Sequence, residues 1–339
     1  MTILQKIEKA KLIGRGGACF PTASKWQMVK EAPDKEKYIV CNASEGEPGI
    51  KKDGYIFKHH PDKVIDGLKI ALNVLKAKKA IIFIRKDYYK KYGRKLKKLS
   101  RGLPIEFFVK DKSWGYIAGE ESSLLNAIEG RKPEPRLRPP FPVTNGLWNK
   151  PTLINNVETF FNVSLVNSGQ YEEKRFYTIN GDCPNTGVFF LPAKWSIKKV
   201  LQETNNAPKF KFFVQVGGNA SGVVYNDSQL NKNVTGSGSI TVYQKSKYGS
   251  RQLMHYWLSF YRGQSCGQCT PCREGTYRLA QIMESKSPDW NLFFEILNAL
   301  DETSICGLGK SISTPIKSYL HNILFKETEY EKNICKNKR

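Results

Sequence analysis

The sequence has no apolar run of membrane-spanning length, few histidines and a marked shortage of acidic residues. Clear apolar runs such as Ile81–Ile84 and Phe212–Val214 are far below the roughly 20 residues that a transmembrane helix needs. The first residues alternate charged and apolar side chains and contain no signal-peptide core. Only 4 histidines occur, and none is spaced with the cysteines as a metal ligand would be. We therefore expect a globular protein of the cytoplasm, with no direct insertion into a membrane.

The charge balance is strongly basic. The chain has 54 lysines and arginines against 31 acidic residues, a formal net charge of +23. Such a field attracts polyanions, so nucleic-acid binding has to be considered. However, the densest basic run, residues 86–101 (KDYYKKYGRKLKKLSR), is typical of the exposed face of one helix. No helix-turn-helix, zinc-finger or RNA-binding signature accompanies it. The sequence favours a lysine-rich surface that aids solubility and docking to an acidic partner.

Cysteine spacing gives the strongest single motif. Cys266, Cys269 and Cys272 recur at every third position, and Cys306 follows after two predicted helices. Three clustered thiols and one distant thiol are a common ligand pattern for a cubane iron–sulfur cluster. Structural zinc sites usually take their ligands as two spaced pairs, and disulfides require an oxidising compartment. The spacing favours a cluster, with zinc and disulfides as the alternatives.

The first half of the chain alternates between predicted strands and helices. A helix over residues 1–11 precedes a glycine-rich loop, Gly14–Thr22, whose backbone amides can approach a ligand closely. Because this loop follows a helix, it is not the Rossmann fingerprint. Strands are predicted at 37–41, 80–84 and 104–109, and helices at 61–76 and 87–99. This order predicts a mostly parallel sheet, with ligands at the carboxyl ends of its strands, where the polar loops 42–49 and 115–121 begin.

The rest of the chain changes character twice. Residues 131–151 contain six prolines and are predicted to be irregular, and a helix is predicted over 152–168. Short strands (176–180, 188–191, 212–216, 240–243) around one helix (196–203) fit a β-grasp module, and the chain from Arg251 onward is predicted to be helical. The predicted fold class is α/β. A Rossmann-like parallel-sheet domain (1–170) is followed by a β-grasp domain (171–246) and a helical bundle that carries the cysteines (247–339).

Six motifs together resemble a known family. They are GRGGACFPT, YIVCNASEGEPG, GYIAGEES, PRLRPPFP, NKPTLINNVET and SCGQCTPCREG. In this order they are similar to the NADH-binding flavoprotein subunit of respiratory complex I. They are equally similar to the diaphorase subunits of NAD-reducing and electron-bifurcating hydrogenases and formate dehydrogenases. The resemblance runs from about residue 12 to about residue 325, and it implies a soluble-ligand-binding type of β-grasp module.

The resemblance also implies an activity. It is an NADH dehydrogenase reaction: hydride transfer from NADH to FMN, then single-electron transfer to a [4Fe-4S] cluster. The implied partners are a thioredoxin-like [2Fe-2S] subunit and a larger iron–sulfur subunit. The implied location is cytoplasmic, peripheral on the inner face of the membrane through a complex. Alternatives are a cluster-bearing relative without NADH turnover and a zinc-containing nucleic-acid-binding protein.

The resemblance assigns site residues by position. Glu47 and Glu121 are implied as catalytic, and the carboxylates of the site disfavour a 2′-phosphate and so favour NADH over NADPH. Three positions depart from the family pattern: Cys19 stands at a usual glycine, Ser44 at a usual aspartate and Met28 at a frequent aromatic residue. FMN contacts are implied for Gly14, Gly16, Gly17, Lys25, Asn42, Ser44, Glu45, Asn155 and Asn156, and places in the cofactor-binding cavity for Arg15, Gly119, Glu120 and Glu121. Dinucleotide contacts are implied for Phe20, Glu47, Arg138 and Phe141, and cluster ligation for Cys266, Cys269, Cys272 and Cys306.

Overall fold

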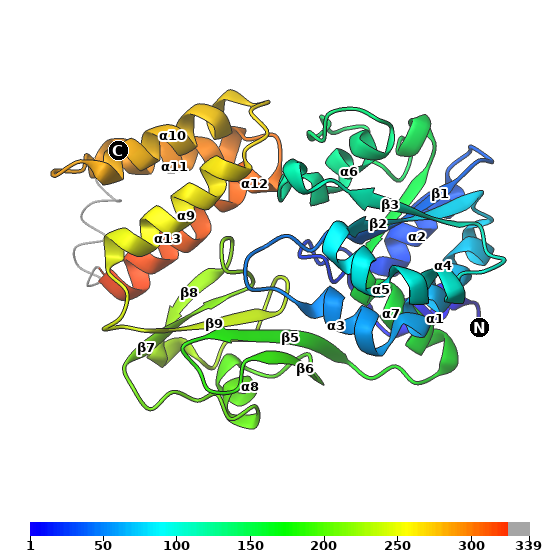
Figure 1. Ribbon diagram of the computed structural model, residues 1–339, viewed down its shortest axis with the longest axis horizontal. Helices are drawn as coiled ribbons and strands as arrows, with labels where there is room; N and C mark the ends of the chain where they lie inside the picture. Colours follow the sequence, from blue (N-terminus) through cyan, green and yellow to red (C-terminus); the bar gives the residue numbers. More distant parts are fainter. Residues whose placement is uncertain (325–339) are drawn as a thin grey trace. The chain divides into compact units, whose positions relative to one another are not determined.

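A computed structural model describes residues 1–324 of the chain, which divide into two compact units. The first unit comprises Met1–Gly46 and Lys51–Phe176, and the second comprises Glu47–Ile50 and the chain from Tyr177 onward (Figure 1). The second unit thus contains both the predicted β-grasp module and the C-terminal helices. Among residues 1–324, none of the helices combines the length and apolar character that crossing a bilayer requires.

The first unit is built on a four-stranded parallel sheet. Its strand order is β3-β2-β1-β4, and every neighbouring pair is parallel. The predicted parallel sheet is therefore confirmed, and its four carboxyl ends meet at one edge. The strands are β1 (Tyr38–Ala43), β2 (Lys79–Arg85), β3 (Ile105–Lys110) and β4 (Thr152–Asn156).

The fourth strand corrects the predicted helix over 152–168. Thr152–Asn156 pairs along β1, and the helix α7 begins only at Val157. The side chain of Asn156 accepts a hydrogen bond from the N–H of Glu158 and so caps the helix. The run TLINN is almost entirely buried. Continuous apolar runs of this kind are typical of strands in parallel sheets, whose two faces are both covered. The correction places Asn155 and Asn156 at the carboxyl end of a strand.

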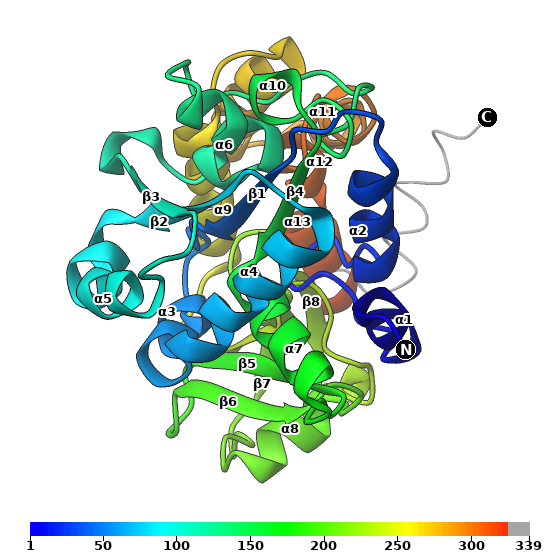
Figure 2. The ribbon, with the colours of Figure 1, turned by 90° about the vertical axis from the view of Figure 1, so that its right-hand side faces the viewer.

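Helices cover both faces of this sheet. Helix α6 packs with Val40, Ile81 and Phe83 on one face, while α4 contacts β1 and β2 and packs along α7 (Figure 2). The predictions missed α2 and α3, which follow the glycine-rich loop and the loop after β1. The helices are α1 (Ile3–Lys9), α2 (Thr22–Glu31), α3 (Lys52–His59), α4 (Pro61–Leu75), α5 (Lys86–Leu99), α6 (Glu121–Ile128) and α7 (Val157–Ser168), with short turns η1 (Lys112–Trp114), η2 (Ile117–Gly119) and η3 (Leu147–Asn149).

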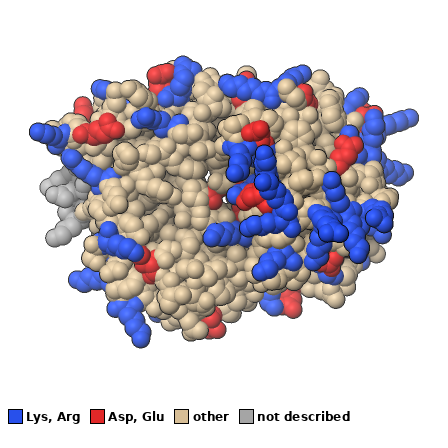
Figure 3. Space-filling model, in the orientation of Figure 1, with Lys and Arg blue, Asp and Glu red and all other residues tan. Residues whose placement is uncertain are grey.

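Helix α5 carries the densest basic run, as predicted. Tyr88, Gly93 and Leu96 are buried against the unit, and the lysines and arginines of the helix are exposed. They form the concentration of basic side chains over α5 in Figure 3. The helix is therefore amphipathic, with its basic face in solvent.

The second unit contains a five-stranded mixed sheet of order β6-β5-β9-β7-β8. Its first and last strands, β5 and β9, are central and parallel, and β7 pairs antiparallel with both β9 and β8. This is the β-grasp topology that the strand and helix pattern predicts. The elements are β5 (Lys174–Gly181), β6 (Gly187–Pro192), α8 (Ile197–Glu203), β7 (Phe212–Val216), β8 (Val223–Asn226), η4 (Asp227–Gln229) and β9 (Ser239–Gln244).

The C-terminal helices pack against this sheet within the same unit. Trp257 of α9 is fully buried, and its indole N–H lies 3.3 Å from Gln215 Oε1 and 3.2 Å from the carbonyl oxygen of Asn219. The phenol of Tyr319 packs against Phe213. The helices are α9 (Ser250–Gln264), α10 (Thr270–Glu284), α11 (Trp290–Thr303), α12 (Gly307–Ser311) and α13 (Ser313–Tyr319), followed by η5 (Leu320–Leu324).

Gly67 sets how closely α4 approaches α7. A Cβ at this position would lie 2.0 Å from the carbonyl oxygen of Phe160, which belongs to the α7 backbone and has no room to move. We expect Gly67→Ala to lower the free energy of unfolding of the first unit by about 1–3 kcal/mol through overpacking. Gly263→Ala is the control, because this helical glycine has nothing within 4 Å of the added Cβ. Denaturant titration measures both, and equal stabilities for the two variants would contradict the prediction.

Candidate functional site

The carboxyl edge of the parallel sheet brings together residues from distant motifs. Asn42 lies opposite Asn156 in the β1–β4 register, and Cys41 lies opposite Asn155. The side-chain amide of Asn42 donates to the carbonyl oxygen of Gly119 at 2.8 Å, which joins the loop after β1 to the segment before α6. Three motifs that the sequence predicts to form one site therefore meet at this edge.

The glycine-rich loop lies against the same edge. The N–H of Gly14 donates to the carbonyl oxygen of Phe20 at 2.8 Å, which closes the loop, and Gly17 adopts a φ of +111° that favours glycine. A Cβ at Gly16 would lie 3.4 Å from the Cβ of Asn156, so the loop passes directly over the start of α7. Cys19 has a φ of +53°, which explains why a glycine suits this position.

Two buried polar atoms at this edge point to a ligand. Ser44 Oγ and Asn155 Oδ1 are buried and have no hydrogen-bond partner among the described residues. Leaving such groups unsatisfied costs free energy, so a polar ligand that reaches either atom is favoured here. Ser44 also lies close to Gly119, where a Cβ would be 3.1 Å from the serine hydroxyl. A side chain at position 119 would crowd this hydroxyl.

Carboxylates and cations alternate at the start of α6. Lys25 Nζ lies 2.9 Å from Glu121 Oε2, and Arg138 forms ion pairs with Glu120 and, at 3.2 Å, with Glu121. Glu120 also caps α6 by accepting from the N–H groups of Ser122 and Ser123. The predicted residues Lys25, Glu120, Glu121 and Arg138 are thus brought together. The rings predicted beside them, Phe20 and Phe141, are 45% and 52% exposed and so present flat apolar surface to a ligand.

A buried ion network, which the sequence did not predict, lies beneath this edge. Lys52, Asp53 and Glu158 are almost completely buried, and Arg15 is 6% exposed. The ammonium of Lys52 lies 2.8 Å from Asp53 Oδ1 and 3.3 Å from Glu158 Oε2. Arg15 Nε lies 4.0 Å from Glu158 Oε1. Lysine and aspartate are normally exposed, and Lys52 and Asp53 follow a loop that contains proline and glycine. Nothing in the local sequence therefore predicts that these two residues are buried.

Glu45 belongs to this network. Its carboxylate accepts from the N–H of Asp53 at 3.1 Å and from the hydroxyl of Tyr88 at 2.5 Å. Burial, together with the Asp53 carboxylate, raises the pKa of Glu45 to about 7. The protein therefore already uses both carboxylate oxygens of a residue predicted to contact FMN.

Glu47, predicted as catalytic, lies in the second unit. Its Oε1 accepts from the N–H of Ala220 at 3.2 Å, from the N–H of Ser221 at 2.9 Å and from the hydroxyl of Ser221 at 2.7 Å. The glycine-rich turn between β7 and β8 encloses this carboxylate, since a Cβ at Gly218 would overlap it. Burial raises the pKa of Glu47.

The predicted cluster ligands lie at helix starts in the second unit. Cys269 is the residue before α10, Cys272 lies in the first turn of α10, and Cys306 is the residue before α12. A Cβ at Gly309 of α12 would lie 3.3 Å from the Cβ of Cys272, so the two segments are in close contact.

Hydrogen bonds shape the cysteine loop. The guanidinium of Arg273 donates to the carbonyl oxygen of Gly267 at 2.7 Å, and Gly267 itself has a φ of +80°. The Sγ of Cys272 lies 3.5 Å from Ser265 Oγ, and burial raises the pKa of the Cys272 thiol. None of the seven described cysteines forms a disulfide. Within residues 1–324, no three His, Cys, Asp or Glu side chains converge on one metal ion. A four-iron cluster is larger than one ion, and the four predicted cysteines, from two adjoining segments, match its ligand set.

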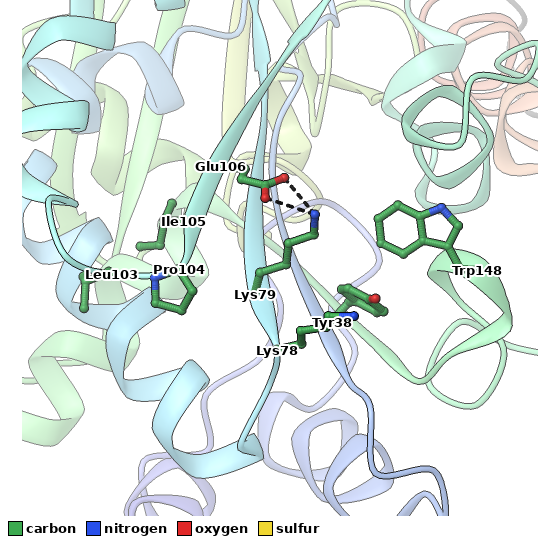
Figure 4. A pocket seen from close by; sticks show the side chains of 8 residues that line it. All are labelled: Tyr38, Lys78, Lys79, Leu103, Pro104, Ile105, Glu106 and Trp148. Atoms are coloured by element: carbon green, nitrogen blue, oxygen red, sulfur yellow. Dashed lines mark hydrogen bonds and ion pairs between the residues drawn. The ribbon is translucent and has the colours of Figure 1, made fainter.

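A pocket of about 560 Å³ opens at the opposite edge of the parallel sheet (Figure 4). Trp148 lines it, with Lys79 held by Glu106 at the amino end of β2. None of the residues that the sequence predicts for a site lines this pocket. The candidate site is therefore the carboxyl edge rather than this pocket.

The raised pKa of Glu45 predicts a pH-dependent stability. Folded Glu45 keeps its proton up to about pH 7, whereas an ordinary glutamate loses it near 4.5. Because the folded state binds more protons in this window, the free energy of unfolding falls as the pH rises through it, by at most about 1.4 kcal/mol per pH unit. We expect Glu45→Gln to remove this slope and Glu106→Gln, on exposed β3, to retain it. Denaturant titrations across the window test this, and parallel curves for wild type and Glu45→Gln would contradict it.

Comparisons with known proteins agree with this geometry. Residues 7–165 match the family model of the Nuo51 FMN-binding domain. Residues 252–331 match the NADH-ubiquinone oxidoreductase-F iron-sulfur binding region. The second match covers all four predicted cluster cysteines and favours a cluster over zinc or disulfides. FMN fits the first region, where the glycine-rich loop and the unsatisfied Ser44 and Asn155 atoms lie.

Whole-chain relatives belong to the same group. The chain is 32% identical to the F subunit of the NADH-quinone oxidoreductase of Aquifex aeolicus, over 97% of this chain and 86% of that protein. It is 30% identical to the alpha subunit of the NAD-reducing hydrogenase HoxS of Cupriavidus necator, over 94% of this chain and 58% of that protein. A crystal structure of an NAD+-reducing [NiFe]-hydrogenase superposes with a TM-score of 0.85 at 29% identity, over 94% of this chain and 60% of that chain. The chain belongs to the family of NADH-quinone oxidoreductase F subunits.

Proposed function

We propose that this chain is an NADH:acceptor oxidoreductase module, which takes hydride from NADH and delivers single electrons to partner subunits. The observation that carries the proposal is the presence, in one chain, of an FMN-binding region at the carboxyl edge and four thiols in an iron–sulfur region. Bound FMN supplies a two-electron acceptor that releases electrons singly, and a [4Fe-4S] cluster supplies a one-electron acceptor.

The proposed FMN site uses the loops of the first unit. Gly14, Arg15, Gly16 and Gly17 provide backbone amides and positive charge for an anionic group, as glycine-rich loops do. Ser44 and Asn155 offer the unsatisfied hydroxyl and carbonyl atoms. Asn42 and Asn156 hold the adjoining loops in place through their own hydrogen bonds. Lys25, Glu45, Gly119, Glu120 and Glu121 complete the proposed contacts.

The proposed dinucleotide site uses exposed rings and paired charges. Phe20 and Phe141 can stack on planar groups, and Arg138 offsets a pyrophosphate. Glu120 and Glu121 are acceptors suited to ribose hydroxyls, and their charge disfavours a 2′-phosphate. Hydride transfer requires orientation more than acid–base chemistry, so Glu121 is proposed to position the nucleotide rather than to transfer protons.

The proposed partners are a thioredoxin-like [2Fe-2S] subunit and a larger iron–sulfur subunit. Two of the relatives bear the names of complex subunits, which supports an assembly of several chains. The proposed location is the cytoplasm, at the inner face of a membrane through that assembly.

NADH should bleach the visible flavin absorbance of the anaerobically purified protein and support reduction of an artificial acceptor. We expect kcat/KM for NADH to exceed that for NADPH by roughly tenfold or more, because carboxylates repel the extra phosphate. Stopped-flow absorbance and steady-state assays measure both. A flavin that NADH does not bleach would instead identify a cluster-bearing relative without NADH turnover. The residues Met28, Ser44 and Cys19, which depart from the family pattern, make this outcome worth testing.

Cys269→Ala should remove the cluster and leave the flavin in place, because the residues proposed to hold the two cofactors belong to different units. We expect cluster iron and the cluster's EPR signal to fall almost to zero, with FMN content unchanged. Cys183→Ala is the control, since this thiol of the second unit bonds only to a backbone carbonyl, that of Asn180. A cluster signal that survives in Cys269→Ala, or disappears in Cys183→Ala, would contradict the assigned ligand set.

A further inference from the structure

Lys52 is an ammonium buried at the start of α3, directly beneath the proposed FMN site. Its side chain is 3% exposed, and its Nζ lies 2.8 Å from Asp53 Oδ1, 2.8 Å from Asn156 Oδ1 and 3.3 Å from Glu158 Oε2. Burying an ion costs several kcal/mol even after pairing, and buried pairs can often be replaced by apolar residues without loss of stability. Packing of the sheet alone therefore does not require a lysine here.

The ammonium fixes the side chain of Asn156. Asn156 Oδ1 accepts from Lys52 and from the N–H of Glu158, while its Nδ2 donates to Asp53 Oδ2 at 2.8 Å. All of its strong hydrogen bonds are thus made within the protein. Its Cβ supports Gly16, where an added methyl carbon would lie 3.4 Å away. The β4–α7 turn that carries this asparagine therefore borders the glycine-rich loop.

The same ammonium links the remaining loops through Glu158. One carboxylate oxygen of Glu158 accepts from the N–H of Phe176 at 3.1 Å and faces Arg15 Nε at 4.0 Å, and the other faces Lys52. Lys52 thereby connects the glycine-rich loop, the segment after β1 and the β4–α7 turn. These are the three segments proposed to bind FMN.

Charge balance gives the lysine a second role. Two cations, Arg15 and Lys52, face the carboxylates of Asp53 and Glu158. Without the ammonium, a single cation would remain against these carboxylates. The edge would become net negative where an anionic cofactor has to bind.

We propose that Lys52 is a positioning residue for FMN, acting through Asn156 and Glu158 and neutralising the carboxylates beneath the cofactor. This inference rests on the proposed function. It assigns Lys52 no contact with the nucleotide or the cofactor.

The test compares Lys52→Met, Lys52→Arg and Lys79→Met in the full-length protein. Lys79 is the control, because it forms an ion pair with Glu106 in the same sheet but at the opposite edge. For Lys52→Met we expect FMN binding, followed by flavin fluorescence, to become about tenfold weaker or more. We also expect a more negative flavin midpoint potential, since uncompensated carboxylates disfavour electron-rich flavin. Lys52→Arg should restore the potential, and Lys79→Met should change neither quantity.

Glu158→Gln gives an independent measurement if Lys52→Met does not fold. It keeps the acceptor for Phe176 and removes one negative charge, so the flavin potential should shift in the positive direction. An unchanged potential in Glu158→Gln, or unchanged FMN affinity and potential in a folded Lys52→Met, would overturn the proposal. Wild type that binds no FMN would instead refute the proposed function, so the two failures are distinguishable.

Discussion

A buried ammonium must be surrounded by oxygen atoms, and this requirement organises the cofactor-binding end of the first unit. Lys52 takes its oxygens from Asp53, Asn156 and Glu158. Each of these belongs to a segment that continues into a proposed cofactor loop. The loops are consequently held by partners inside the protein rather than by the ligand. A site whose surroundings are fixed in this way is preorganised, which reduces the ordering that binding requires.

The sequence predicted the parallel sheet and the edge that carries the site, because apolar strands alternate with helices in its first half. The prediction from the sequence was wrong where a short apolar run is compatible with both a strand and a helix. Thr152–Asn156 continues smoothly into the helical Val157–Ser168, and only pairing with β1 defines it as a strand. Burial of Lys52 could not be predicted for a related reason. The tertiary fold places Glu158 next to Lys52, and no periodic pattern in the sequence predicts a contact between residues so far apart.

A resemblance transfers residue identities but not their hydrogen-bond partners. Glu45 and Glu47 were both predicted to face ligands, yet the carboxylate of Glu45 is engaged by Asp53 and Tyr88 and that of Glu47 by Ala220 and Ser221. Neither partner set is readable from the motif. The cysteine pattern behaves differently, because three cysteines at every third residue are brought near one another by local geometry alone. Only Cys306 depended on the tertiary fold, through the contact between α12 and Cys272.

Ser44 shows how the charge balance accommodates a departure from the family pattern. Its hydroxyl is buried beside Gly119, at the edge where Arg15 and Lys52 face the carboxylates of Asp53 and Glu158. The aspartate usual in the family would add a further carboxylate to this edge, and each further carboxylate raises the cost of binding an anion there. Serine keeps a hydrogen-bonding atom and omits the charge. In this chain, the two buried cations therefore have two carboxylates to offset rather than three.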